Sequence, residues 1–157
     1  MKVVLLGIGK TDDSYLTTGC DVYLNRLKHY FKTEIQFIPD LKKSKGLSAE
    51  ERCKKEGEEL LSQLQTADTV ILLDEKGLEF TSRKFADFIQ KQANTGSKRV
   101  VFIIGGAFGF SEEVYQRANY KLALSKMTFS HQMVRLFFLE QLYRACTILN
   151  NEPYHND

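Results

Sequence analysis

The sequence has few of the residues that mark several classes of protein. Its 157 residues include no tryptophan, two prolines and three cysteines. Cys20, Cys53 and Cys146 are widely spaced and in no CxxC pair, which favours reduced thiols over disulfides or zinc ligands. No apolar stretch reaches the roughly 18 residues of a membrane helix, and the amino terminus lacks a signal-peptide pattern. We therefore expect a cytoplasmic protein with no membrane segment and no metal centre.

The net charge is also small, at +2, and does not by itself indicate a nucleic-acid-binding protein. The densest basic run contains Lys42, Lys43 and Lys45. Clustered lysines can neutralise phosphates without reading sequence, although similar loops are common in proteins that never meet RNA. A hydrophobic fraction of 43% with 11 Phe and 7 Tyr is enough for one core. We expect a single domain over residues 1–157.

Short apolar segments alternate with helical patterns along the chain. The expected strands are residues 2–8, 34–38, 69–73, 98–104 and 122–124. The expected helices are residues 13–31, 48–65, 82–93, 112–117 and 131–149, and an S-x-x-E capping box of Ser48 and Glu51 starts the second of them. Strands separated by helices predict an α/β fold, with a parallel-rich sheet flanked by helices.

One motif near the amino terminus imitates a nucleotide-binding loop. Gly7-Ile8-Gly9-Lys10-Thr11 resembles the end of a P-loop, but Val4 stands where that motif needs its first glycine. The same GxG could begin a dinucleotide-binding fold with Asp40 as the ribose acid, although Asp12 replaces the third glycine. A nucleotide-binding α/β protein that uses residues 7–11 therefore stays an alternative.

The last third of the chain is the most informative. The strand at residues 98–104 ends at Gly105-Gly106, where backbone can approach a ligand closely. The segment Leu72-Leu73-Asp74-Glu75-Lys76-Gly77 ends another strand with an acid and a turn at Gly77, and residues 124–129 would form a third side of the same rim. The helix at residues 131–149 is apolar almost all round, so it must be wrapped by its own chain, by a partner subunit or by both.

Four strings in the sequence carry a family resemblance: LLDEKG, IIGGAFGF, LSKMTFSHQMVRLFFLEQLYRA and the terminal NNEPYH. They resemble the SPOUT-class methyltransferases. Within that class they are similar to the small single-domain RlmH family, which methylates N3 of a pseudouridine in 23S ribosomal RNA. The resemblance covers essentially the whole chain. It implies a SPOUT-type fold with a deep trefoil knot near the carboxyl terminus, a homodimer, and a substrate in the assembled ribosome.

The resemblance also implies S-adenosyl-L-methionine as the cofactor. Its pocket would be formed by the three loops of the rim. The residues expected to bind it are Leu73, Gly105, Leu124, Ser125, Lys126, Met127, Thr128 and Phe129. Backbone groups in such loops can bond an adenine edge and ribose hydroxyls. A non-enzymatic RNA-binding or ribosome-associated dimer that kept the fold is the other alternative.

The polar side chains expected near the chemistry are those of His131, Arg135, Tyr154 and His155. Tyr154 and His155 lie in a tail that normally would be frayed, but the match of NNEPYH indicates that it docks, and we expect it to complete the opposite subunit's site. His155 could accept the N3 proton, because histidine titrates near neutral pH. Arg135, on an apolar helix, needs a partner: a phosphate, a base carbonyl or a structural carboxylate. Glu140 and Arg144 lie four residues apart and should pair with each other.

Overall fold

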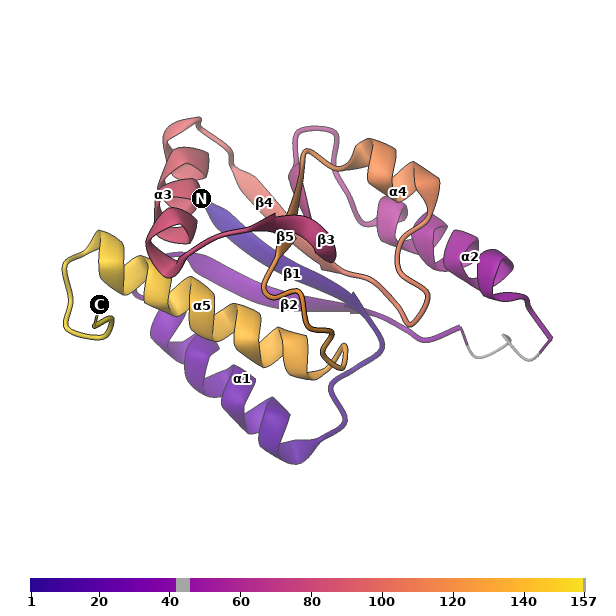
Figure 1. The fold of residues 1–157 in the computed structure, drawn as a ribbon, viewed down its shortest axis with the longest axis horizontal. Helices are drawn as coiled ribbons and strands as arrows, with labels where there is room; N and C mark the ends of the chain where they lie inside the picture. Colours follow the sequence, from indigo (N-terminus) through magenta and orange to yellow (C-terminus); the bar gives the residue numbers. More distant parts are fainter. Residues whose placement is uncertain (42–45, 157) are drawn as a thin grey trace.

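The computed structural model describes residues 1–41 and 46–156, and strands and helices alternate along them (Figure 1). The strands are β1 (Lys2–Ile8), β2 (Lys32–Ile38), β3 (Thr69–Glu79), β4 (Arg99–Ile104) and β5 (Tyr120–Ala123). The helices are α1 (Ser14–Leu27), α2 (Ala49–Ser62), α3 (Ser82–Asn94), α4 (Glu112–Arg117) and α5 (Met133–Leu149). The basic run of Lys42, Lys43 and Lys45 lies outside the described residues.

The strands form one sheet in the order β2-β1-β4-β3-β5, and every neighbouring pair is parallel. This confirms the α/β fold class with a parallel sheet. Because all strands run the same way, their carboxyl ends share one edge of the sheet, which is where open α/β sheets bind ligands. The segments that follow Leu73, β4 and β5 therefore lie on the same side of the molecule.

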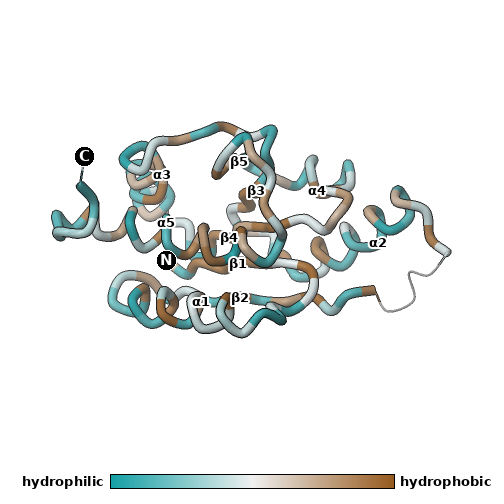
Figure 2. Tube along the Cα trace, turned by 60° about the horizontal axis from the view of Figure 1, so that its bottom comes forward, coloured by the Kyte–Doolittle hydropathy of each residue, from teal (hydrophilic) through white to brown (hydrophobic). Residues whose placement is uncertain are grey.

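Successive residues of the central strands alternate between two apolar layers. Val3 and Leu5 of β1 pack with α1, α3 and α5, whereas Val4 and Leu6 pack with α2 and α4. Helix α5 lies between α1 and α3 on the first face, and the ring of its Phe138 lies 4.5 Å from that of Phe102 on β4. Figure 2 shows apolar residues concentrated along β1 and β4 in the middle of the sheet. The apolar helix α5 is thus wrapped partly by its own chain.

The helix boundaries follow local hydrogen bonds. The capping box of α2 is confirmed, because Ser48 Oγ accepts from Glu51 N–H at 3.1 Å and Ser48 N–H donates to the Glu51 carboxylate at 2.8 Å. Helix α5 begins at Met133 rather than His131, and in the turn before it Met133 N–H donates to Ser130 Oγ at 3.1 Å. Helix α1 ends earlier than expected, at Leu27.

Strand β3 differs from the prediction in its length. It continues past Leu73 to Glu79, and both Leu73 and Leu78 pair with Leu122 of β5, so the residues between them bulge out of the ladder. A Cβ at Gly77 would lie 2.6 Å from Leu122 N. The predicted strand end at Leu73 is therefore wrong: Gly77 lies within the strand and lets β3 and β5 approach closely, and Asp74 lies in the bulge.

Candidate active site

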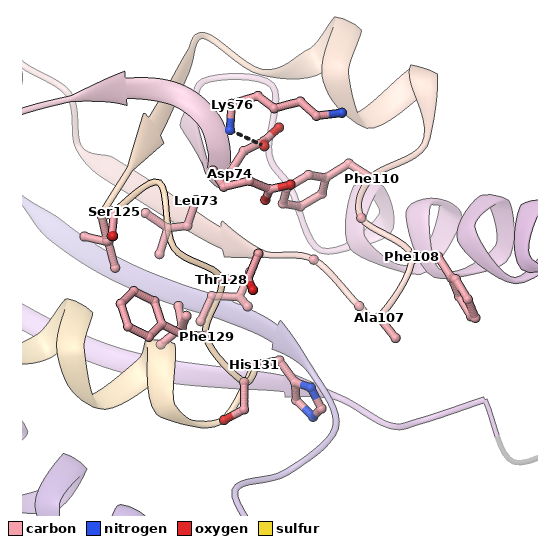
Figure 3. A pocket seen from close by; sticks show the side chains of 18 of the residues that line it. Leu73, Asp74, Lys76, Ala107, Phe108, Phe110, Ser125, Thr128, Phe129 and His131 are labelled. Atoms are coloured by element: carbon pink, nitrogen blue, oxygen red, sulfur yellow. Dashed lines mark hydrogen bonds between the residues drawn. The ribbon is translucent and has the colours of Figure 1, made fainter.

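A cavity of about 700 Å³ lies at the bulge of β3 and the carboxyl end of β4, beside the segment that follows β5 (Figure 3). The three segments predicted to form the rim converge there. Seven of the eight predicted cofactor residues line it: Leu73, Gly105, Leu124, Ser125, Met127, Thr128 and Phe129. Lys126 is the exception, because its side chain is 83% exposed and its Nζ lies 3.8 Å from the Glu79 carboxylate. Its side chain points out of the cavity.

The loop after β4 is tightly folded around its glycines. Gly109 N–H donates to the Gly106 carbonyl at 3.1 Å, and Gly109 has a φ of 79°, in the left-handed region that favours glycine. A Cβ at Gly105 would lie 3.0 Å from the Gly109 carbonyl oxygen. A Cβ at Gly106 would lie 2.1 Å from Glu56 Oε2 of α2. A larger residue would therefore have to displace the Gly109 backbone at position 105 or the Glu56 carboxylate at position 106.

Asp74 is held in the wall of the cavity by two hydrogen bonds. Tyr115 Oη donates to its Oδ2 at 2.7 Å, and Lys76 N–H donates to its Oδ1 at 2.9 Å. Burial, reinforced by the bond to Asp74, raises the pKa of Tyr115, so the phenol stays a donor. Sequence reasoning missed Tyr115, because nothing in a six-residue helix indicates a partner 41 residues away. The same linkage fixes the β3 bulge against α4.

Arg135 is 1% exposed and has partners other than those expected. Its Nη2 donates to the carbonyls of Ile8 at 2.8 Å and Gly9 at 2.7 Å, and its Nη1 donates to Thr11 Oγ1 at 2.7 Å. Burial lowers the pKa of this guanidinium. The expectation of a phosphate, a base carbonyl or a carboxylate as its partner is corrected: Arg135 ties α5 to the end of β1. Its catalytic role, contact with the substrate, does not fit this burial.

The same contacts bear on the nucleotide-binding alternative. A phosphate loop presents backbone N–H groups to the anion. Here Gly9 N–H donates to the Ile38 carbonyl at 2.8 Å, while the carbonyls of Ile8 and Gly9 and the hydroxyl of Thr11 accept from Arg135. The motif at residues 7–11 is thus arranged around a cation of its own chain, which disfavours this alternative.

The carboxyl-terminal tail is folded against α5 and α1. Tyr154 Oη donates to Glu140 Oε1 at 3.0 Å and lies 3.3 Å from Tyr23 Oη. Arg144 stacks over the Tyr154 ring at 4.7 Å, and its Nη1 lies 3.4 Å from His155 Nδ1. The predicted pair of Glu140 and Arg144 is confirmed, with Nε donating at 3.1 Å. Tyr154 and His155 are therefore packed against their own chain.

The tail and the cavity lie at opposite ends of α5 (Figure 1). The cavity includes His131 and Val134 near the start of the helix, whereas Tyr154 and His155 follow its last turn. A helix of 17 residues is about 25 Å long at 1.5 Å per residue. Within one chain, Tyr154 and His155 are therefore not part of the cavity that Leu73 and Gly105 line.

An apolar patch borders the mouth of the cavity. The side chains of Met127, Phe129 and Phe137 are all exposed, and the rings of Phe129 and Phe137 lie 4.9 Å apart. Phe137 is on the outer face of α5. Three large apolar side chains together at a pocket rim are typical of a contact surface.

Across residues 1–41 and 46–156, no helix is both long and apolar enough to cross a bilayer. Within those same ranges, no three His, Cys, Asp or Glu side chains are grouped as a metal site would need. The cysteines found there, Cys20, Cys53 and Cys146, are free thiols.

Comparisons with known proteins identify the family. The family model described as "Predicted SPOUT methyltransferase" matches residues 1–155. The "Ribosomal RNA large subunit methyltransferase H" of Christiangramia forsetii is 58% identical over 99% of both chains, and those of Cytophaga hutchinsonii and Parabacteroides distasonis are 55% and 54% identical over at least 99% of each chain.

A solved structure shares the fold. It is a probable methylase family protein from Haemophilus influenzae Rd KW20, with a TM-score of 0.52 at 12% identity. The match covers 95% of this chain and 66% of the other. Together with the sheet order and the convergent loops, these matches are decisive: the chain belongs to the SPOUT methyltransferase family, with relatives named ribosomal RNA large subunit methyltransferase H.

Proposed function

We propose that this protein methylates N3 of a pseudouridine in 23S ribosomal RNA, with S-adenosyl-L-methionine as the methyl donor. The observation that carries the proposal is the cavity at the carboxyl edge of the sheet, in a chain 58% identical to a protein named as a ribosomal RNA methyltransferase. An enzyme with this substrate would act in the cytoplasm. The deep trefoil knot stays a prediction that follows from family membership.

The cavity fits a cofactor of this size. Its volume of about 700 Å³ lies within the roughly 300–1,000 Å³ typical of small-molecule sites. We propose that backbone groups of Leu73, Gly105 and residues 124–129 bind the adenosine part, since the glycine loop brings backbone to the wall. The carboxylate of Asp74, fixed by Tyr115, gives the wall a negative group that suits a cationic sulfonium.

When bound, S-adenosyl-L-methionine supplies an electrophilic methyl group. Transfer of that methyl group to N3 would require the N3 proton to leave for a base. We propose His155 as that base, directly or through water, with Tyr154 beside it. Arg144 lies 3.4 Å from His155 and is better placed than the buried Arg135 to stabilise the developing imide anion.

This chemistry requires a second subunit. Since Tyr154 and His155 lie at the far end of α5 from the cavity of their own chain, we propose a homodimer in which each tail completes the partner's site. The patch of Met127, Phe129 and Phe137 beside the cavity supports an interface there. We expect sedimentation to show a dimer at micromolar concentration, and a stable monomer would contradict the proposal.

A mixed dimer tests the arrangement across subunits. One subunit ends after Asn151 and so lacks the tail, and the other carries Gly105→Val, which blocks its pocket. The truncated subunit's intact pocket meets the partner's intact tail, so one working site should survive. If the mixture is as inactive as either parent homodimer, the tail does not act across the interface.

The substrate is proposed to be the assembled ribosome rather than naked RNA, because a net charge of +2 gives little general affinity for phosphates. Mass spectrometry of 23S RNA from a strain lacking the gene should show the loss of one methylated pseudouridine. The wild-type gene should restore it, and Gly105→Val should not. Equal methylation of a short naked stem-loop would overturn the ribosome requirement. An unchanged RNA modification pattern in the deletion strain would overturn the proposed function.

A further inference from the structure

Phe108 stands out among the aromatic side chains of the cavity. Phe110 packs on Tyr115 with ring centroids 5.7 Å apart, and Phe129 packs on Phe137. Phe108 is 51% exposed, at the turn of the glycine loop between β4 and α4. In Figure 3 its ring lies across the cavity from Ser125 and points outward. An exposed ring on a pocket rim is available to a ligand that arrives from outside.

A buried ion pair on α2 supports this loop. Glu56 is 2% exposed and accepts from Arg52 Nε at 2.9 Å. Its other oxygen lies where a Cβ at Gly106 would clash, so helix and loop are in direct contact. The Arg52 guanidinium lies 5.9 Å from the centroid of the Phe108 ring and 3.9 Å from Asp40. Helix α2 therefore supports the loop through Glu56 and places the Arg52 guanidinium over the Phe108 ring.

The combination of a flat exposed ring, a guanidinium and a nearby methyl-donor pocket matches how proteins hold unstacked bases. RNA bases are recognised by stacking on aromatic side chains and on arginine planes. Such stacking is insensitive to base identity, because every base has a π-face. We propose that Phe108, with Arg52 beside it, stacks on a base that flanks the target pseudouridine. This inference rests on the proposed function.

The ring faces outward, so its ligand is a base of the RNA rather than the adenine of the cofactor. Variants of Phe108 can therefore distinguish stacking on an RNA base from stacking on the cofactor's adenine. Phe108→Leu keeps an apolar side chain and removes the π-face, whereas Phe108→Tyr keeps the π-face. Leu78→Ala is the matched control, because Leu78 is also exposed and apolar but does not line the cavity.

The variants are compared in ribosome methylation kinetics, in ribosome binding, and in calorimetry with S-adenosyl-L-methionine alone. Phe108→Leu should raise the KM for ribosomes and weaken ribosome binding by about tenfold, which is about 1.4 kcal/mol and within the range of base–aromatic stacking. Its affinity for S-adenosyl-L-methionine should stay within twofold of wild type. Sedimentation should show the same oligomeric state as wild type. Phe108→Tyr keeps the π-face and should bind ribosomes more tightly than Phe108→Leu does, whereas Leu78→Ala should match wild type throughout.

Three outcomes would overturn the stacking role. If Phe108→Leu binds ribosomes as tightly as wild type, Phe108 does not stack on the RNA. Weakened cofactor binding at constant ribosome affinity would assign the ring to the cofactor, and dissociation to monomers would assign it to the interface. If the wild-type protein binds ribosomes but does not methylate them, the proposed function is wrong. The ribosome affinities of wild type and Phe108→Leu would still decide whether Phe108 contacts the RNA.

Discussion

Replacing Arg135 with methionine removes the guanidinium that joins α5 to the end of β1 and keeps a side chain of similar length. The carbonyls of Ile8 and Gly9 then lose the donor that the structure gives them, and Thr11 loses a partner at the protein surface. A buried acceptor without a donor costs about 1–3 kcal/mol. Methionine avoids the burial penalty that lowers the pKa of Arg135, which offsets part of this loss. We expect a net destabilisation of about 2–4 kcal/mol.

The measurement is urea unfolding followed by circular dichroism, at one fixed protomer concentration because the stability of a dimer depends on concentration. The midpoint should fall while the slope m stays constant. Lys91→Met is the control, since Lys91 is an exposed cation on α3 and its loss should change stability by less than about 0.5 kcal/mol.

Two results would refute this reasoning. A loss below about 1 kcal/mol would show that water or a rearranged backbone replaces the guanidinium without penalty. A variant as stable as wild type that has lost turnover would return Arg135 to the catalytic role first expected of it. If Arg135 is structural, activity per folded molecule should be nearly unchanged.

The remaining predictions concern the loop, the tail, the interface and pH. Gly106→Ala should weaken cofactor binding in calorimetry by tenfold or more. The new Cβ would lie 2.1 Å from Glu56 Oε2, so the loop that lines the cavity would have to shift. Full binding would show that the clash is relieved without moving the loop. Truncation after Asn151 should abolish methylation yet keep cofactor binding, and residual turnover near wild type would exclude the tail from catalysis. Phe137→Glu should give monomers in sedimentation, and an intact dimer would place the interface elsewhere. Burial raises the pKa of Cys146 from 9.0 to about 12, so the native state keeps a proton that the unfolded chain releases. Stability should fall as pH rises through that window, by up to about 1.4 kcal/mol per pH unit, and Cys146→Ala should show a smaller slope in urea midpoints.

The elements that local sequence determines were predicted well. Strand β1 is an apolar run that begins after Lys2 and stops before Gly9, and its predicted ends agree with the structure. The capping box of α2 lies within four residues, so its geometry can be anticipated from Ser48 and Glu51 alone. The glycine pair at the end of β4 indicated a position where side chains are excluded, and the structure places the Gly109 backbone against Gly105 and the Glu56 side chain against Gly106.

The errors arise where a partner is distant in the sequence. The residues around Gly77 have turn-like composition, and only pairing with β5 through Leu122 makes that segment strand. A helical wheel places Arg135 with polar neighbours, but its acceptors come from residues more than 120 positions earlier. The docking of Tyr154 was indicated by family resemblance alone, because no periodic pattern links it to Tyr23 or Glu140.

The length of helix α5 also sets the distance between the cavity and the carboxyl-terminal tail. Its first turn borders the cavity, and its last turns hold the tail through Glu140 and Arg144. Removing one residue between Leu136 and Leu139 would bring the ends about 1.5 Å closer and rotate one against the other by about 100°. Deleting a residue from α5 should consequently reduce activity more than replacing one of its outward-facing side chains.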